Sequence, residues 1–187
     1  RGFNKVFGLE VSDEQVKYGN MMIGKKLITK NKSEEIEHLA EKINAQIVTS
    51  IFHLEHIENP LRFLQKIKKN KNIKYLFISV PLYSFGVIFE LLFDKVMPRI
   101  LGECHTHLFT NESLKWIENK LSFKLIGSWW FGSDMFDLHK SVMVSLKNKM
   151  GNNSIANKFH QNFEVIWDSM QKIIDKKKMC SEVHLVY

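Results

Sequence analysis

Histidines gather at two places where the sequence predicts that a strand gives way to a loop. His53 and His56 follow the apolar run Ala45 to Ile51, and His105 and His107 lie in a later loop. An imidazole titrates near neutral pH, so a histidine at such a position can act as a general base on a hydroxyl group. We take His107 as the first candidate for this role and His56 as the second. A hydrogen-bonded, structural loop histidine stays open as the alternative for both.

The same side chains could instead bind a metal ion. Cys104 precedes the pair His105 and His107, and His53 and His56 lie elsewhere, so nitrogen and sulfur ligands are present. Their spacing matches no standard zinc signature, and we therefore predict no metal site. The sequence also contains no GxSxG nucleophile elbow and no phosphate-binding loop.

A second group of candidates is suited to holding a substrate. Trp129 and Trp130 precede Asp134, and an aromatic pair beside an acid can stack on a sugar or another ring and orient it. Tyr83 and Arg99 could line the same pocket, where the planar guanidinium would suit a phosphate or carboxylate. A hydrophobic cap over the edge of a sheet is the alternative role for the tryptophans.

Apolar runs alternating with helical patterns must position these groups. The clearest runs are Ala45 to Ile51 and Ile73 to Val80. Near-continuous apolar strands that alternate with helices indicate a parallel sheet covered on both faces. Ligands bind such sheets at the carboxyl ends of the strands, which are here residues 10–12, 50–56 and 81–84.

The other elements follow from caps, turn residues and the spacing of apolar residues. A turn is expected at residues 151–154, and one long amphipathic helix is expected over residues 155–173. The remaining expected helices cover residues 12–18, 33–43, 60–67, 85–97, 111–121 and 135–146, and the remaining strands 5–11, 25–29, 123–130 and 181–187.

Composition limits the class of protein. An apolar share of 44% in 187 residues suits one globular domain rather than a disordered chain. Two cysteines far apart in sequence indicate a reducing, cytoplasmic location, and no signal-peptide pattern is visible.

The apolar stretch Tyr75 to Phe89 is short for a membrane span and is interrupted by Pro81 and Gly86, so no membrane partner is expected. The formal charge of +7 lies in lysine runs near turns, without a base-stacking motif, so no nucleic-acid partner is expected either.

Five segments in order carry a resemblance to a known family. They are VFGLEVS (6–12), IVTSIFHLEHIENPLRFL (47–64), YLFISVP (75–81), HTHLFTNESLKWI (105–117) and SEVHLVY (181–187). Together they resemble class I S-adenosylmethionine-dependent methyltransferases, in particular those that act on sugars, quinones and other small molecules. The resemblance covers nearly the whole chain.

The resemblance implies a Rossmann-like α/β fold. It comprises a mainly parallel sheet with helices on both faces and a terminal antiparallel strand at Ser181 to Tyr187. The family's first strand and glycine-rich cofactor loop have no counterpart here, because Gly8, Gly19 and Gly24 are not arranged as such a loop. We therefore interpret residues 1–187 as a single methyltransferase domain that is incomplete at its N-terminus, with a degenerate relative as the alternative.

The resemblance also implies roles for individual residues. S-adenosylmethionine is the expected cofactor, with a small molecule as the methyl acceptor. Glu10 would accept hydrogen bonds from the ribose hydroxyls, which makes it the principal cofactor residue. The remaining cofactor contacts expected are Val11, Ser50, Ile51 and Phe52, and the substrate contacts are Tyr83, Arg99, His105, Trp129 and Trp130. A non-catalytic binding module and a basic nucleic-acid-binding domain stay open as alternative functions.

Overall fold

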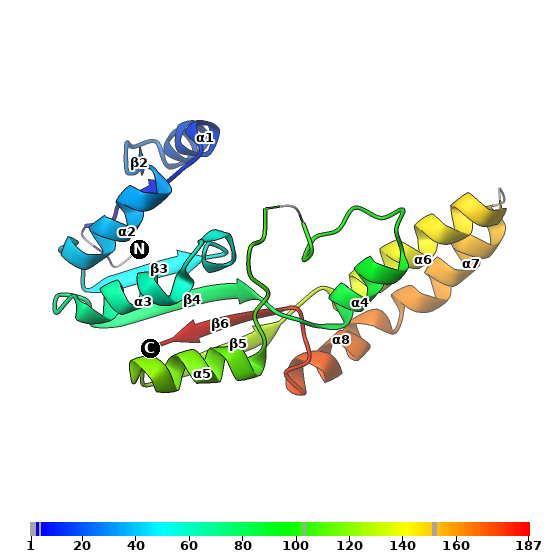
Figure 1. The fold of residues 1–187 in the computed structure, drawn as a ribbon. Coiled ribbons are helices and arrows are strands. Elements are labelled where there is room, and N and C mark those ends of the chain that lie inside the picture. Colours follow the sequence, from blue (N-terminus) through cyan, green and yellow to red (C-terminus); the bar gives the residue numbers. More distant parts are fainter. Residues whose placement is uncertain (1–2, 4, 103, 151–152) are drawn as a thin grey trace. The chain divides into compact units, whose positions relative to one another are not determined.

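The computed structural model describes residues 3, 5–102, 104–150 and 153–187 (Figure 1). The chain divides into two compact units. The first comprises Arg1–Gln46 and Leu61–Ile73, and the second comprises Ile47–Pro60 and Lys74–Tyr187. The expectation of a single domain stays a prediction. The turn expected at residues 151–154 begins outside the described residues, and Asn153 already belongs to a helix.

A short parallel pair of strands begins the first unit. β1 (Gly8–Glu10) pairs with β2 (Ile28–Lys30), and α1 (Asp13–Ile23) connects them. Ser12 caps α1 by accepting a hydrogen bond from the Gln15 N–H, as its residue type predicts. The side chain of Asn20 then holds the helix to β2, since its amide donates to the Ile28 carbonyl while its oxygen accepts the Ile28 N–H.

The helices α2 (Ser33–Lys42) and α3 (Pro60–Lys69) pack together in the first unit, which α3 enters at Leu61. The buried amide of Asn70 donates to the carbonyls of Ala40 and Ile43, which satisfies the last turn of α2. α3 begins at Pro60, where a missing N–H has no cost, as the sequence predicts.

The second unit contains a four-stranded mixed sheet. Its order is β3 (Ile47–Ile51), β4 (Tyr75–Pro81), β6 (Glu182–Val186) and β5 (Gly127–Phe131). β3 and β4 are neighbouring parallel strands, and β6 is antiparallel to β4, so both expectations are confirmed. The sheet is mixed, because β3, β4 and β5 run in the same direction and β6 runs against them. The last strand inserts between β4 and β5, and it is antiparallel to both of them.

The two faces of this sheet differ in their cover. Along β6, Val183 and Leu185 are buried, and Tyr187 beyond the strand donates from its hydroxyl to Glu118 of α5 (Asn111–Leu121). The opposite face carries exposed apolar side chains, including Ile51 at 56% and Trp129 at 65%. Within the second unit, the described residues therefore leave this face of β3 and β5 partly exposed.

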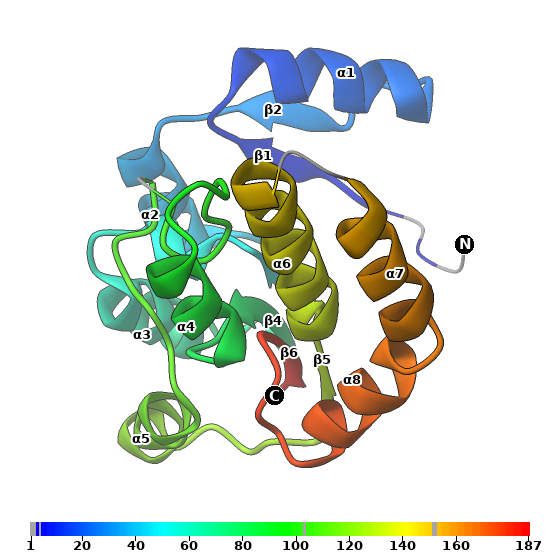
Figure 2. The same cartoon turned by 90° about the vertical axis from the view of Figure 1, so that its right-hand side faces the viewer.

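Four helices form a separate layer beyond the carboxyl end of β4 (Figure 1). α4 (Phe85–Leu92) packs on α6 (Asp134–Met150), which lies beside α7 (Asn153–Glu164) in both views (Figures 1 and 2). The single helix expected over residues 155–173 is wrong, because the chain turns at residues 165–166 before α8 (Trp167–Lys176). Both turn residues are β-branched, which lowers helix propensity.

Among the described residues we find no helix long and apolar enough to cross a membrane.

Candidate functional site

In the first unit, Glu10 ends β1 and turns the chain toward α1. Its Oε1 atom accepts the N–H groups of Val11 at 2.7 Å and Ser12 at 2.9 Å. These two bonds fix the carboxylate at the carboxyl end of the strand, and Oε2 accepts no hydrogen bond from any described residue. An acid held in this way can accept hydroxyl donors from a ligand. Asp13, in the next turn, is instead paired with Lys30 of β2.

In the second unit, Ser50, Ile51 and Phe52 lie at the carboxyl end of β3. The Ser50 side chain is buried, and its hydroxyl has no hydrogen-bond partner among the described residues. Phe52 has a φ of 46°, which is costly for a bulky residue, and its N–H donates to the Ser79 carbonyl at 2.9 Å. A strained backbone next to an unpartnered hydroxyl marks this strand end as a candidate ligand site.

The structure brings His56, His105 and His107 together in the second unit. A one-turn 3₁₀ helix, η1 (Leu54–His56), follows β3, and the irregular segment after α4 passes over it. The backbone carbonyl of Glu55 accepts the N–H of Thr106 at 2.8 Å and that of His107 at 3.2 Å. Residues nearly fifty positions apart in sequence are thereby held at one place.

Two of these imidazoles are oriented by backbone carbonyls. His56 Nδ1 lies 2.9 Å from the Cys104 carbonyl oxygen, and His105 Nδ1 lies 2.7 Å from the Ile100 carbonyl oxygen. A carbonyl only accepts, so each Nδ1 carries the proton and each Nε2 carries a lone pair in the neutral ring. The two rings meet edge to face, with their centroids 4.8 Å apart.

The neighbouring Thr106 sets the tautomer of His107. The Thr106 hydroxyl donates to the Glu55 carbonyl at 2.9 Å, and its oxygen lies 2.9 Å from His107 Nδ1. A hydroxyl has a single proton, so His107 Nδ1 is the donor in the second contact. His107 Nε2 therefore has a lone pair, as a general base requires.

Glu55 is the acid of the "LEH" turn, and sequence reasoning gave it no specific role. Its side chain is 1% exposed, and Oε2 has no hydrogen-bond partner among the described residues. Burial raises the pKa of the Glu55 carboxyl, against the opposing effects of its own backbone N–H and of His56 and His105. A buried carboxylate faces the histidine cluster, with Oε1 3.9 Å from His56 Nε2.

The structure separates the proposed substrate residues. Trp129 and Trp130 are adjacent in β5, so they lie on opposite faces of the sheet. Trp129 is exposed beside His184, at 5.5 Å between ring centroids, whereas Trp130 lies under the Lys178 ammonium. Tyr83 follows β4 with its side chain half exposed.

Arg99 has its donors already engaged. Its guanidinium donates to Asp137 at 2.8 Å, to Glu182 at 2.7 Å and to the Ser181 hydroxyl at 3.1 Å. Burial acts to lower the pKa of Arg99, but Asp137 and Glu182 outweigh it and raise that pKa. The geometry favours a structural role that joins α6, β6 and the segment after α4.

Asp134 is also a structural residue, which sequence reasoning placed beside a substrate. It is 0% exposed and accepts the Ser84 hydroxyl at 2.6 Å and the N–H groups of Gly86 and Ser181. Its position shortly after a strand and at the start of α6 was the sequence signal that could have indicated this structural role.

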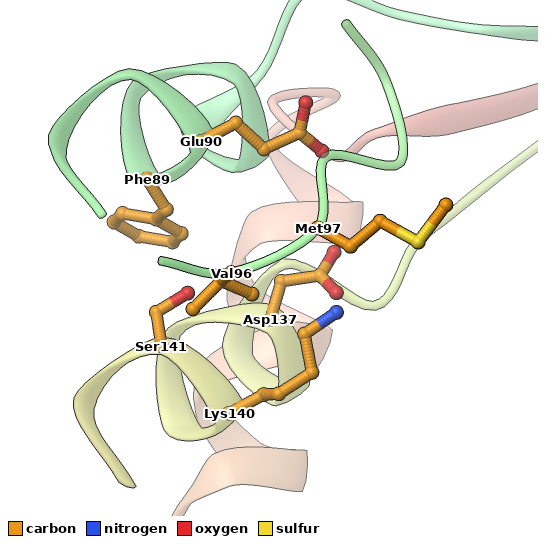
Figure 3. Close-up of a pocket in the computed structure, with 7 residues that line it drawn as sticks. All are labelled: Phe89, Glu90, Val96, Met97, Asp137, Lys140 and Ser141. Atoms are coloured by element: carbon orange, nitrogen blue, oxygen red, sulfur yellow. The ribbon is translucent and has the colours of Figure 1, made fainter. Parts of the chain in front are cut away.

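Figure 3 shows the nearby hollow between α4 and α6, lined by Glu90, Met97 and Lys140 among others. At about 10 Å³ it has room for about one water molecule, so it is no substrate pocket.

Comparison with known proteins rests on structure alone. Neither a family sequence profile nor a curated protein sequence matches the chain significantly. A SAM-dependent methyltransferase from Archaeoglobus fulgidus superposes with a TM-score of 0.54 at 15% identity, over 96% of this chain and 74% of that one. The methyltransferase domain of bacterial CtHen1 gives 0.54 at 14%, over 98% and 77%. The small RNA methyltransferase HEN1 gives 0.55 at 16%, over 96% and 20%.

The chain has the class I methyltransferase fold. In this fold, the five segments that carry the resemblance lie on regular elements in the expected order. Residues 6–12 form β1 and its turn, residues 47–64 form β3, η1 and the first part of α3, and residues 75–81 form β4. Residues 105–117 lead into α5, and residues 181–187 form β6.

Proposed function

We propose that the protein transfers a methyl group from S-adenosylmethionine to a small-molecule acceptor such as a sugar, a quinone or a similar hydroxyl, amine or carbon centre. The observation that carries this proposal is the methyltransferase fold with an acid, Glu10, fixed at the end of β1 and a histidine, His107, held with a lone pair on Nε2. The first group suits a ribose, and the second suits an acceptor hydroxyl.

Cofactor binding would use groups at two strand ends. The available lone pairs of Glu10 would accept the ribose hydroxyls, and the exposed residue Val11 lies beside them. At β3, the unpartnered Ser50 hydroxyl supplies a polar contact, while Ile51 and Phe52 supply apolar surface. Bound S-adenosylmethionine supplies an electrophilic sulfonium methyl group, and the protein positions the acceptor and excludes water.

Proton removal from the acceptor would fall to His107. Its Nε2 would accept the proton of an acceptor hydroxyl, and Thr106 holds the protonated Nδ1 in place. His56 is the second candidate, because its Nε2 is also unprotonated in the neutral ring. His105 and the exposed rings of Tyr83 and Trp129 are proposed substrate contacts. Trp130, on the opposite face of β5, and Arg99, whose donors are engaged, remain sequence-based candidates that the geometry does not favour.

Calorimetric titration of the natural full-length protein with S-adenosylmethionine tests the proposal. Glu10→Ala should weaken binding by about 1–3 kcal/mol, the usual effect of losing charge-assisted hydrogen bonds. Asp13→Ala is the matched control, because that carboxylate lies three residues further along the chain but is paired with Lys30. An unchanged affinity in Glu10→Ala would remove the principal cofactor residue.

The two alternative functions predict different results for ligand binding and turnover. A non-catalytic binding module would bind a ligand without turnover of S-adenosylmethionine in any acceptor mixture. A nucleic-acid-binding domain would instead bind RNA or DNA with an affinity that falls steeply as salt rises, because its lysines would displace counterions.

A further inference from the structure

The cluster of His56, Cys104 and His105 has a geometry that general-base chemistry does not need. One potential ligand atom from each residue lies within 4.8 Å of the corresponding atoms of the other two. In a tetrahedral zinc site with bonds of about 2.0–2.3 Å, two ligand atoms lie about 3.3–3.8 Å apart. The cluster is therefore wider than a closed site by at most about 1.0–1.5 Å, which rotation of the side chains can supply.

The imidazoles are already oriented as metal-binding histidines are. A ligating histidine usually donates its other ring N–H to a carbonyl or carboxylate, which fixes the tautomer and directs the lone pair. His56 and His105 each donate Nδ1–H to a backbone carbonyl, at 2.9 Å and 2.7 Å.

The surrounding charge favours a cation. The Glu55 carboxylate is 1% exposed, has an oxygen without a hydrogen-bond partner among the described residues, and lies 3.9 Å from His56 Nε2. Cys104 is a free, exposed thiol that can lose its proton to a metal. A divalent ion bound by one thiolate beside one carboxylate gives a local charge of zero.

Backbone hydrogen bonds also hold the loop that carries Cys104 and His105 in place. The His105 N–H donates to the Gly102 carbonyl at 3.0 Å. The hydroxyl and N–H of Thr106 both donate to the Glu55 carbonyl, at 2.9 Å and 2.8 Å, and fix that loop on η1. The ligands from the two segments are thus positioned by backbone contacts rather than by one another.

We propose that His56, Cys104 and His105 form a mononuclear site for a borderline-soft divalent cation, with Zn²⁺ as the fitting ion and the Glu55 carboxylate as its charge partner. Two nitrogen ligands and one sulfur ligand suit zinc, and three protein ligands leave a fourth position open for water or a substrate oxygen. The ion would tie η1 to the loop that carries His107. In this arrangement His56 is a ligand, and His107 alone remains as the base.

Titration of the chelator-treated, full-length protein with Co²⁺ and Zn²⁺ tests the site. Co²⁺ should bind at one equivalent and give a thiolate-to-cobalt charge-transfer band in the near ultraviolet, which Zn²⁺ then displaces. Cys104→Ser should abolish that band, and His105→Ala should weaken binding by about a hundredfold or more, since even outer contacts contribute 10–100-fold. Glu55→Gln should weaken it by about tenfold.

The helical histidine pair provides the matched control. His139 and His160 lie 3.1 Å apart between ring nitrogens on α6 and α7, so His139→Ala removes an imidazole from a comparable pair. Its metal affinity should equal that of the unchanged protein. Binding without the charge-transfer band, or equal affinity in Cys104→Ser and the unchanged protein, would overturn the proposal. Because Cys104 is exposed, its replacement by Ser should leave the fold intact.

Discussion

Two regions of the second unit each bring a pair of histidines together, and they do so in different ways. In the loop over η1, His56 and His105 direct Nδ1 to backbone carbonyls, so neither ring uses its other nitrogen on its neighbour. Between α6 and α7, His139 Nε2 and His160 Nδ1 lie 3.1 Å apart and form a hydrogen bond with each other. The loop pair, His56 and His105, retains lone pairs for a ligand, whereas the two rings of the helical pair, His139 and His160, are hydrogen-bonded to each other.

The surroundings of the two pairs reinforce this difference. His139 stacks on Phe159 and Phe163 and meets Trp167 edge to face, so its ring serves as part of an apolar helix interface. The loop pair instead lies beside a thiol and a buried carboxylate, Cys104 and Glu55. Proximity of two imidazoles is therefore a weak sign of function, and the partner of each second nitrogen is a stronger one.

The largest expected effect separates the two cysteines of the chain. Burial, followed by the charge of Asp175, raises the pKa of the Cys180 thiol to about 12. At pH 8 about one part in ten thousand of such a thiol is ionised, and the thiolate is the reactive form. Iodoacetamide should label the exposed Cys104 at least a thousandfold faster than Cys180, as measured by mass spectrometry of the peptides.

Repeating the labelling with bound Zn²⁺ tests the proposed metal site. Bound Zn²⁺ should protect Cys104 from labelling in the unchanged protein and leave it reactive in His105→Ala. Rapid labelling of Cys180 in the folded protein would contradict its buried position next to β6.

The next effect concerns turnover. His107→Ala should lower kcat by about a hundredfold, the usual contribution of a positioned base, with little change in cofactor affinity. His160→Ala is the control, since that ring belongs to the self-satisfied pair and should leave kcat unchanged. Thr106→Val should lower kcat less than His107→Ala, because it removes the acceptor that sets the tautomer but leaves the ring.

The pH profile distinguishes a base from a structural histidine. The acid limb of kcat should disappear in His107→Ala and persist in His160→Ala. Loss of cofactor binding or of folding in His107→Ala, with turnover retained per folded molecule, would show that the ring is structural.

Local sequence signals predicted most of the elements. Ser12, Pro60 and Thr110 begin helices as their residue types indicate, and the two apolar runs form neighbouring parallel strands. The methyltransferase resemblance rested on strand-end residues, and each of the five segments lies on the expected element. Caps and strand-end motifs are local, so a single sequence can show them.

Features that depend on distant pairing could not be predicted. The insertion of β6 between β4 and β5 makes the sheet mixed, and no periodicity in residues 181–187 specifies those neighbours. Similarly, the helical spacing continues through Val165 and Ile166, so the break there is not visible in the pattern of apolar residues. The same limit applies to the proposed metal ligands, because 48 positions separate His56 from Cys104.

The smallest expected effect concerns stability and the helical pair. Burial, and then the charge of His160, lowers the pKa of His139 below its ordinary value, while Glu164 acts in the opposite direction. The folded state therefore binds fewer protons than the unfolded state as pH falls below the ordinary histidine pKa of about 6.5, and the free energy of unfolding must decrease there. The aromatic rings that surround His139 on α6, α7 and α8 do not titrate in this range, so His160 and Glu164 are the groups that modulate the pKa of His139.

Urea unfolding at a series of values between about pH 7 and about pH 5 should show this decrease in the free energy of unfolding of the unchanged protein. His139→Gln should show a shallower decrease, because the replacement cannot be protonated. The control His105→Gln should retain the full slope, since His105 belongs to the loop pair. Equal slopes in His139→Gln and the unchanged protein would show that the pH dependence of stability arises outside the helical pair, and the contrast between the two histidine regions would then rest on hydrogen bonding alone.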